Sequence, residues 1–117
     1  MSDITRREDI VFLVDTFYDK VIADDLLSPV FAHVDWPAHM PTMYSFWASL
    51  LLAEQSYRGN PYQKHVSLPI TARHFRRWLK LFSQTVNQHF EGPKASEAIE
   101  RAKAIASLFQ HRMGLNA

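Results

Sequence analysis

Hydrophobic residues recur every three or four positions along most of the chain, which is the spacing of one face of an α-helix. The first such stretch covers about residues 6–23, and Thr5 followed by Glu8 predicts a capping box at its start. Its apolar face consists of Ile10, Leu13, Val14, Phe17 and Val21. No stretch alternates with the period of two that is typical of a half-buried strand. The pattern predicts an all-α protein.

Prolines mark the start of the second long helix. Residues 28–31 are expected to form a short turn or helix, and the second long helix then runs from Asp35 to about Glu54. Pro37 and Pro41 are expected near its start, where a missing backbone amide costs least.

Turn residues and prolines also divide the second half of the chain. Residues 62–68 form a segment of one or two helical turns that Pro69 ends. Thr71 caps a third long helix, and Gly92-Pro93 separates it from a fourth, for which Gly114 suits the C-cap. The apolar face of the third helix consists of Phe75, Leu79, Phe82 and Val86. That of the fourth consists of Ile99, Ala102, Ala106 and Phe109. Four long helices with irregular connections are therefore predicted.

Composition narrows the class of protein. The 117 residues, 47% of them hydrophobic, suit one domain spanning residues 1–117. Thirteen Lys and Arg are scattered among twelve Asp and Glu, which argues against a nucleic-acid or membrane partner. The chain has no cysteine, so disulfides, thiolate zinc sites and iron–sulfur clusters are excluded. Acidic residues interrupt the first apolar stretch, so neither a signal peptide nor a membrane span is expected there, and we expect a cytoplasmic protein.

One histidine falls on the apolar face of the second long helix. His39 lies with Met43, Phe46, Trp47 and Leu50 within an arc of roughly 100°. A buried imidazole costs free energy unless a hydrogen bond, a metal or a ligand satisfies it. Position 39 is therefore either a hydrogen-bonded core histidine or part of a binding site.

Tyr18 and Trp78 lie at the edges of apolar helix faces, and ordinary packing explains each of them when it is taken alone.

A second histidine, His65, lies in the short segment 62–68, where little else would account for a histidine that points inward. His65 could ligate a metal through one ring nitrogen while the other donates to a backbone carbonyl, unless it simply faces solvent. The 26-residue separation from His39 suits the two faces of a planar cofactor better than one tetrahedral zinc centre.

Segments in the same order and with similar spacing resemble the group III truncated haemoglobins. They are FYDKV at 17–21, LLSPVF at 26–31, W-x-x-H at 36–39, FWASLLL at 46–52, YRGNP at 57–61, K-H-x-x-L-P at 64–69, HFRRWLKLF at 74–82 and A-x-x-IASLFQ at 102–110. The resemblance covers nearly the whole chain.

The resemblance implies a truncated globin, a two-over-two helical sandwich around haem b. It makes His65 the proximal iron ligand and Tyr18, His39 and Trp78 the distal ligand-binding residues. Phe31, Met43, Phe46 and Trp47 would line the haem pocket. Tyr57, Arg58 and Lys64 cluster beside His65 and are candidates for the haem propionates, because they offer donors or positive charge.

The expected function is binding of O2, NO or CO at a five-coordinate iron. A distal side crowded with donors favours redox chemistry or sensing over bulk transport. Nitric oxide dioxygenase and peroxidase-like activities both fit, as does oxygen carriage, and a reductase is an expected partner. The alternatives are a cofactor-free helical interaction module, which would be colourless, and a non-haem metalloenzyme.

Overall fold

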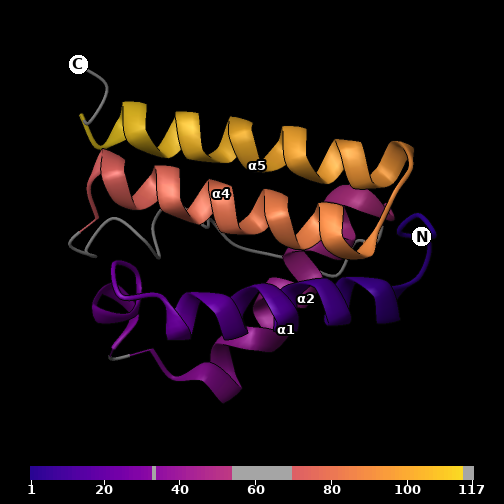
Figure 1. Ribbon diagram of the computed structural model, residues 1–117, viewed down its shortest axis with the longest axis horizontal. Helices are drawn as coiled ribbons and strands as arrows, with labels where there is room; N and C mark the ends of the chain where they lie inside the picture. Colours follow the sequence, from indigo (N-terminus) through magenta and orange to yellow (C-terminus); the bar gives the residue numbers. More distant parts are fainter. Residues whose placement is uncertain (33, 54–69, 115–117) are drawn as a thin grey trace.

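A computed structural model describes residues 1–32, 34–53 and 70–114, and within these ranges every regular element is a helix (Figure 1). The elements are α1 (Arg7–Ala23), η1 (Ser28–Phe31), α2 (Trp36–Leu51), α4 (Ala72–His89) and α5 (Pro93–Arg112). The predicted all-α class is confirmed. Tyr57, Arg58, Lys64, His65 and the predicted segment 62–68 lie outside the described residues.

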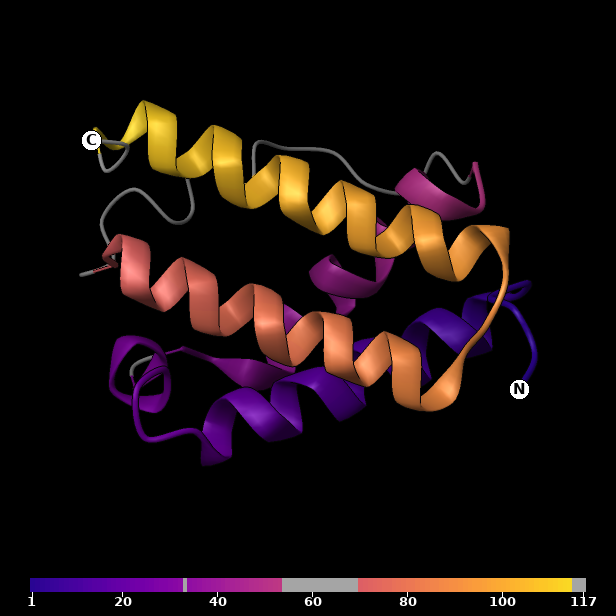
Figure 2. The ribbon, with the colours of Figure 1, turned by 45° about the horizontal axis from the view of Figure 1, so that its top comes forward.

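The helices form two layers. α4 and α5 run antiparallel side by side, and α1 and α2 cover the opposite side of the core (Figures 1 and 2). Phe17 of α1, Leu51 of α2 and Phe82 of α4 belong to one hydrophobic core and are almost completely buried. The sandwich forms because each helix carries one apolar face that only a facing helix can bury.

The start of α1 differs from the predicted capping box. The helix begins at Arg7, so its third residue is Asp9, not Glu8. The Asp9 carboxylate accepts hydrogen bonds from the backbone N–H groups of Thr5 (2.9 Å) and Arg6 (3.1 Å). The prediction of Glu8 as the capping partner is therefore wrong, because the helix register starts one residue later than expected.

α2 is shorter than its apolar pattern suggested. It ends at Leu51, and Ala53 adopts a left-handed conformation with φ 58° that stops the helix before the expected Glu54. Pro37 lies in the first turn as predicted, but Pro41 lies inside the helix. A proline there removes one intrahelical hydrogen bond, and the helix nevertheless continues past it to Leu51.

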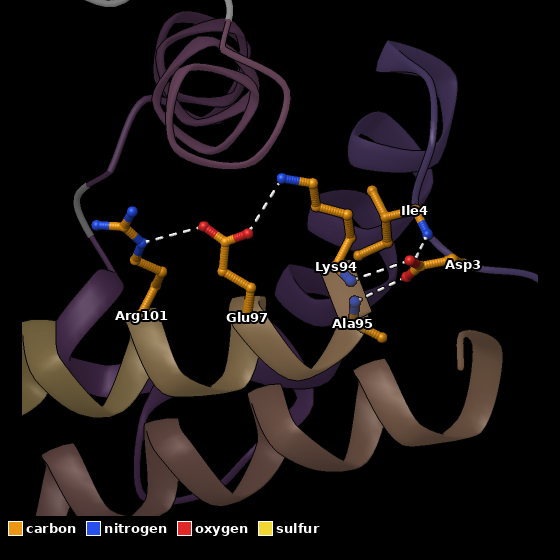
Figure 3. A network of polar contacts seen from close by, with 6 residues as sticks. All are labelled: Asp3, Ile4, Lys94, Ala95, Glu97 and Arg101. Carbon is orange, nitrogen blue, oxygen red and sulfur yellow. Dashed lines mark hydrogen bonds and ion pairs between the residues drawn. The ribbon is translucent and has the colours of Figure 1, made fainter. Parts of the chain in front are cut away.

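The N-terminal segment supplies the cap that α5 lacks. The N-cap of α5 is Gly92, which has no side chain to offer. The Asp3 carboxylate instead accepts hydrogen bonds from the backbone N–H groups of Lys94 (2.9 Å) and Ala95 (2.8 Å) (Figure 3). Two observations require glycine at position 92. A Cβ there would lie 2.6 Å from Asp3 Cγ, and the backbone has a φ of 141°, which side-chain-bearing residues rarely adopt. At the other end of α5, Gly114 has φ 72°, as its predicted capping role requires.

Candidate functional site

An aromatic pocket opens between the two helical layers. It encloses about 680 Å³ of space, part of which is open to solvent. Most of its lining is apolar, and the described residues that line it are Tyr18, Leu27, Val30, Phe31, Met43, Phe46, Trp47, Ile70, His74, Phe75, Trp78, Ile105 and Phe109. A lining of aromatic and aliphatic side chains interrupted by few polar groups suits a flat organic ligand.

Stacked rings fix one wall of the pocket. Phe82 stacks on Trp47 of α2, with centroids 4.7 Å apart, and on Trp78 one turn away in its own helix, at 5.7 Å. Phe17 of α1 meets both Phe82 and Trp78 edge to face. Because three helices contribute to this cluster, the positions of Trp47 and Trp78 in the wall are held by packing from both layers.

Tyr18 brings a hydroxyl group into this apolar surface. Its side chain is only 5% exposed and meets the ring of Phe31 edge to face. Burial raises the pKa of Tyr18 well above its usual value, and a hydrogen bond with the Trp78 side chain offsets part of that rise. The indole N–H can only donate, so the phenol oxygen accepts from it. The Tyr18 hydroxyl therefore keeps its proton at neutral pH and can donate it to a ligand.

His39 stands beside Tyr18. Its ring lies edge to face with Tyr18 at 5.7 Å and with Trp36 at 5.6 Å between centroids. The predicted inward orientation of His39 is thus found, although the side chains that line the described part of the pocket do not include it. Its position suits it to restrain the Tyr18 ring.

His74 is a polar lining residue that the sequence analysis missed. Its Nδ1 accepts a hydrogen bond from the backbone N–H of Thr71 (3.0 Å), and Thr71 Oγ1 lies 2.8 Å from the same nitrogen. An accepting Nδ1 places the ring proton on Nε2, which leaves a donor for a ligand. The available signal was its spacing from Trp78, because residues i and i+4 share one face of a helix.

The structure brings most of the predicted pocket residues together. Tyr18, Phe31, Met43, Phe46, Trp47 and Trp78 all line the one aromatic pocket. The predictions for Tyr57, Lys64 and His65 concern residues outside the described ranges.

Within the described ranges, no three His, Asp or Glu side chains gather as a metal site would require. Likewise, none of the described helices is both long and apolar enough to cross a membrane.

Comparison with known proteins gives one consistent result. The family model for bacterial-like globins matches residues 2–113. The chain is 35% identical over 115 residues to the group 3 truncated hemoglobin ctb of Campylobacter jejuni, covering 92% of this chain and 91% of that protein. The crystal structure of group III truncated hemoglobin from Campylobacter jejuni matches with a TM-score of 0.87 at 35% identity, over 97% of this chain and 95% of that one. The similarity in sequence and in fold therefore extends over nearly the whole chain.

Proposed function

The chain belongs to the bacterial-like globins and, within them, to the group III truncated haemoglobins, so it is a haem globin that binds small diatomic ligands, and we propose that the aromatic pocket holds haem b. The residues present fit that group. The lining is mostly aromatic and aliphatic, as a porphyrin requires, and the polar groups of Tyr18, His74 and Trp78 interrupt it.

His65 is proposed as the proximal iron ligand. It lies five positions before Ile70, which lines the pocket, so even an extended chain keeps it within about 18 Å of that residue. Tyr57 and Lys64 are proposed to contact the propionates, because both precede His65 in the connection between α2 and α4 and offer a hydrogen-bond donor and a positive charge. A neutral imidazole ligand would leave the opposite face of the haem to Tyr18, Trp78 and His39.

When bound, haem supplies a ferrous iron with one open coordination position for O2, NO or CO. The observation that carries the proposal is the buried Tyr18 hydroxyl beside Trp78, inside an otherwise apolar pocket. The Tyr18 hydroxyl would donate to the ligand, the Trp78 indole N–H would orient that hydroxyl by donating to its oxygen, and His39 would restrain the Tyr18 ring. Each such hydrogen bond contributes on the order of 1 kcal/mol, which slows ligand loss.

Strong retention favours reaction over release. The proposed role is therefore redox chemistry of O2, NO or peroxide, or ligand sensing, more than bulk oxygen transport. We further propose that a reductase regenerates the ferrous protein and that residues 1–117 form a single domain. A cytoplasmic location is also proposed, and the absence of cysteine from the chain is consistent with it.

Haem titration of the apoprotein tests this proposal. Trp47 and Trp78 line the pocket, so we expect one equivalent of haem to quench most of the tryptophan fluorescence while a Soret band appears. Phe46→Glu, which places a charge in the pocket, should weaken uptake, whereas Phe12→Glu at a 47% exposed position should not. If the protein stays colourless and added haem leaves its tryptophan fluorescence unchanged, the result would favour the cofactor-free interaction module.

A further inference from the structure

A basic groove runs along α4 beside the end of α1. It is lined by Leu26, Arg73, Arg76, Arg77 and Lys80 and encloses about 550 Å³ of space, much of it open to solvent. The four basic residues recur every three or four positions, so they share one face of the helix. The face spans about 10 Å along the helix axis, from the first to the last of them.

Most of the charge in the groove is uncompensated. Arg77 forms an ion pair with Asp24 at 3.0 Å, in which the Asp24 side chain is 9% exposed. Arg73, Arg76 and Lys80 are exposed, and none of them pairs with a carboxylate among the residues that the structure describes. The whole chain has a net charge of only +1, so the groove is a local concentration of positive charge.

The groove and the aromatic pocket lie on adjacent faces of the same elements. Arg73 and Arg77 line the groove, and the residues that follow them, His74 and Trp78, line the pocket. The turn after α1 repeats this arrangement, with Leu26 in the groove and Leu27 in the pocket. A molecule seated in the groove would therefore be separated from the pocket by about one helix diameter, on the order of 10 Å.

We propose that the basic groove is the docking surface for an acidic electron-carrier protein that reduces the haem iron. The proposal rests on the proposed function, because it needs a redox group in the pocket. With haem bound, the reduced carrier would give up one electron and become oxidised, and the iron would pass from the ferric to the ferrous state. Cations spread over two helical turns of an open groove match an acidic protein face better than the compact charge of a single phosphate. Solvated Lys and Arg side chains of this kind steer association with an anionic face.

Binding of a flavodoxin, an acidic one-electron carrier, serves as the probe. Its dissociation constant for the purified chain is measured by fluorescence anisotropy at an ionic strength of about 20 mM. Arg76→Glu/Lys80→Glu should weaken binding by at least about tenfold. The matched control Lys20→Glu/Lys103→Glu makes the same change in net charge on α1 and α5 and should change binding less than about twofold. At about 0.5 M salt the difference should disappear.

The rate at which reduced flavodoxin reduces the ferric holoprotein should follow the same order among the three proteins. Equal weakening by both double variants would overturn the proposal, because net charge and not the groove would then govern binding. Undetectable flavodoxin binding by the unmodified chain would also overturn it. Saturable one-site binding of inorganic pyrophosphate would also overturn the proposal if Arg76→Glu/Lys80→Glu abolished that binding and left flavodoxin binding unchanged. The groove would then be assigned to a small anion.

Anisotropy separates this proposal from the haem proposal, because it does not require haem. A chain that takes up no haem, yet binds flavodoxin through Arg76 and Lys80, would contradict only the proposed function. A chain that takes up haem normally, and whose flavodoxin affinity is unchanged by the charge reversal, would contradict only the docking surface.

Discussion

The phenol ring of Tyr18 meets the imidazole of His39 edge to face, with ring centroids 5.7 Å apart and an angle of 88° between the planes. The contact joins α1 to the first turn of α2 and restrains the only tyrosine among the described residues that line the pocket. Trp78 reaches the same hydroxyl from α4. Residues from three helices therefore converge on the Tyr18 side chain, which is expected of a group that must present a hydrogen bond in a fixed direction.

Tyr18→Phe removes this donor while keeping the ring. Loss of a hydrogen bond of about 1 kcal/mol should raise the O2 dissociation rate of the ferrous protein by about fivefold or more, as measured by stopped-flow absorbance. Tyr44→Phe is the matched control, because Tyr44 hydrogen-bonds to Asp15 and does not line the described pocket. If Tyr18→Phe and Tyr44→Phe leave the rate equally unchanged, Tyr18 is not the donor.

Trp78→Phe tests whether the two donors act as a unit. Trp78 hydrogen-bonds to Tyr18, so each substitution also alters the partner that remains. The O2 dissociation rates of the two single variants and the double variant should therefore be non-additive, with a coupling energy of about 0.5 kcal/mol or more. Purely additive effects would mean that Trp78 and Tyr18 reach the ligand independently.

Asp3→Ala tests the cap that the N-terminal segment provides to α5. Burial alone would raise the pKa of Asp3, but the N–H groups of Lys94, Ile4 and Ala95 and the charge of Lys94 bring it below 3.8. Because the folded-state pKa is depressed, the stabilisation is complete above about pH 4 and is lost as the pH falls through the folded value. At pH 7 the variant should unfold with a free energy about 1 kcal/mol lower in urea denaturation.

The same series near pH 3 provides the internal control for Asp3. The gap between Asp3→Ala and the unmodified protein should narrow there, because the carboxyl group becomes protonated and accepts the α5 N–H groups less strongly. A gap that stays constant from pH 7 to pH 3 would show that the ionised carboxylate contributes nothing to the cap.

Local chemistry in the sequence was sufficient to predict most of the helices. α4 begins directly after Thr71 and α5 begins at Pro93, as expected, because N-cap and helix-breaking residues determine the backbone conformation of the residues next to them. The aromatic lining was also predictable, because Met43, Phe46 and Trp47 share one face of α2 with the period of a helix.

Contacts between distant parts of the chain were not predictable. The hydrogen bond from the Ala95 N–H to Asp3 joins residues 92 positions apart, and no local pattern marks Asp3 as the cap of a helix whose own N-cap is glycine. The pairing of Arg77 with Asp24, 53 positions earlier in the chain, is equally non-local. His74 was missed because its inward orientation depends on how α4 packs against the remainder of the pocket.

The absorption spectrum of the ferrous His65→Gly variant, recorded with and without added imidazole, tests the central claim most directly. Removal of the proximal ligand should abolish the five-coordinate spectrum of the unmodified holoprotein, and free imidazole should restore it by filling the space left by the side chain. A His65→Gly variant that takes up haem and keeps the unmodified five-coordinate spectrum without imidazole would contradict ligation of the iron by His65.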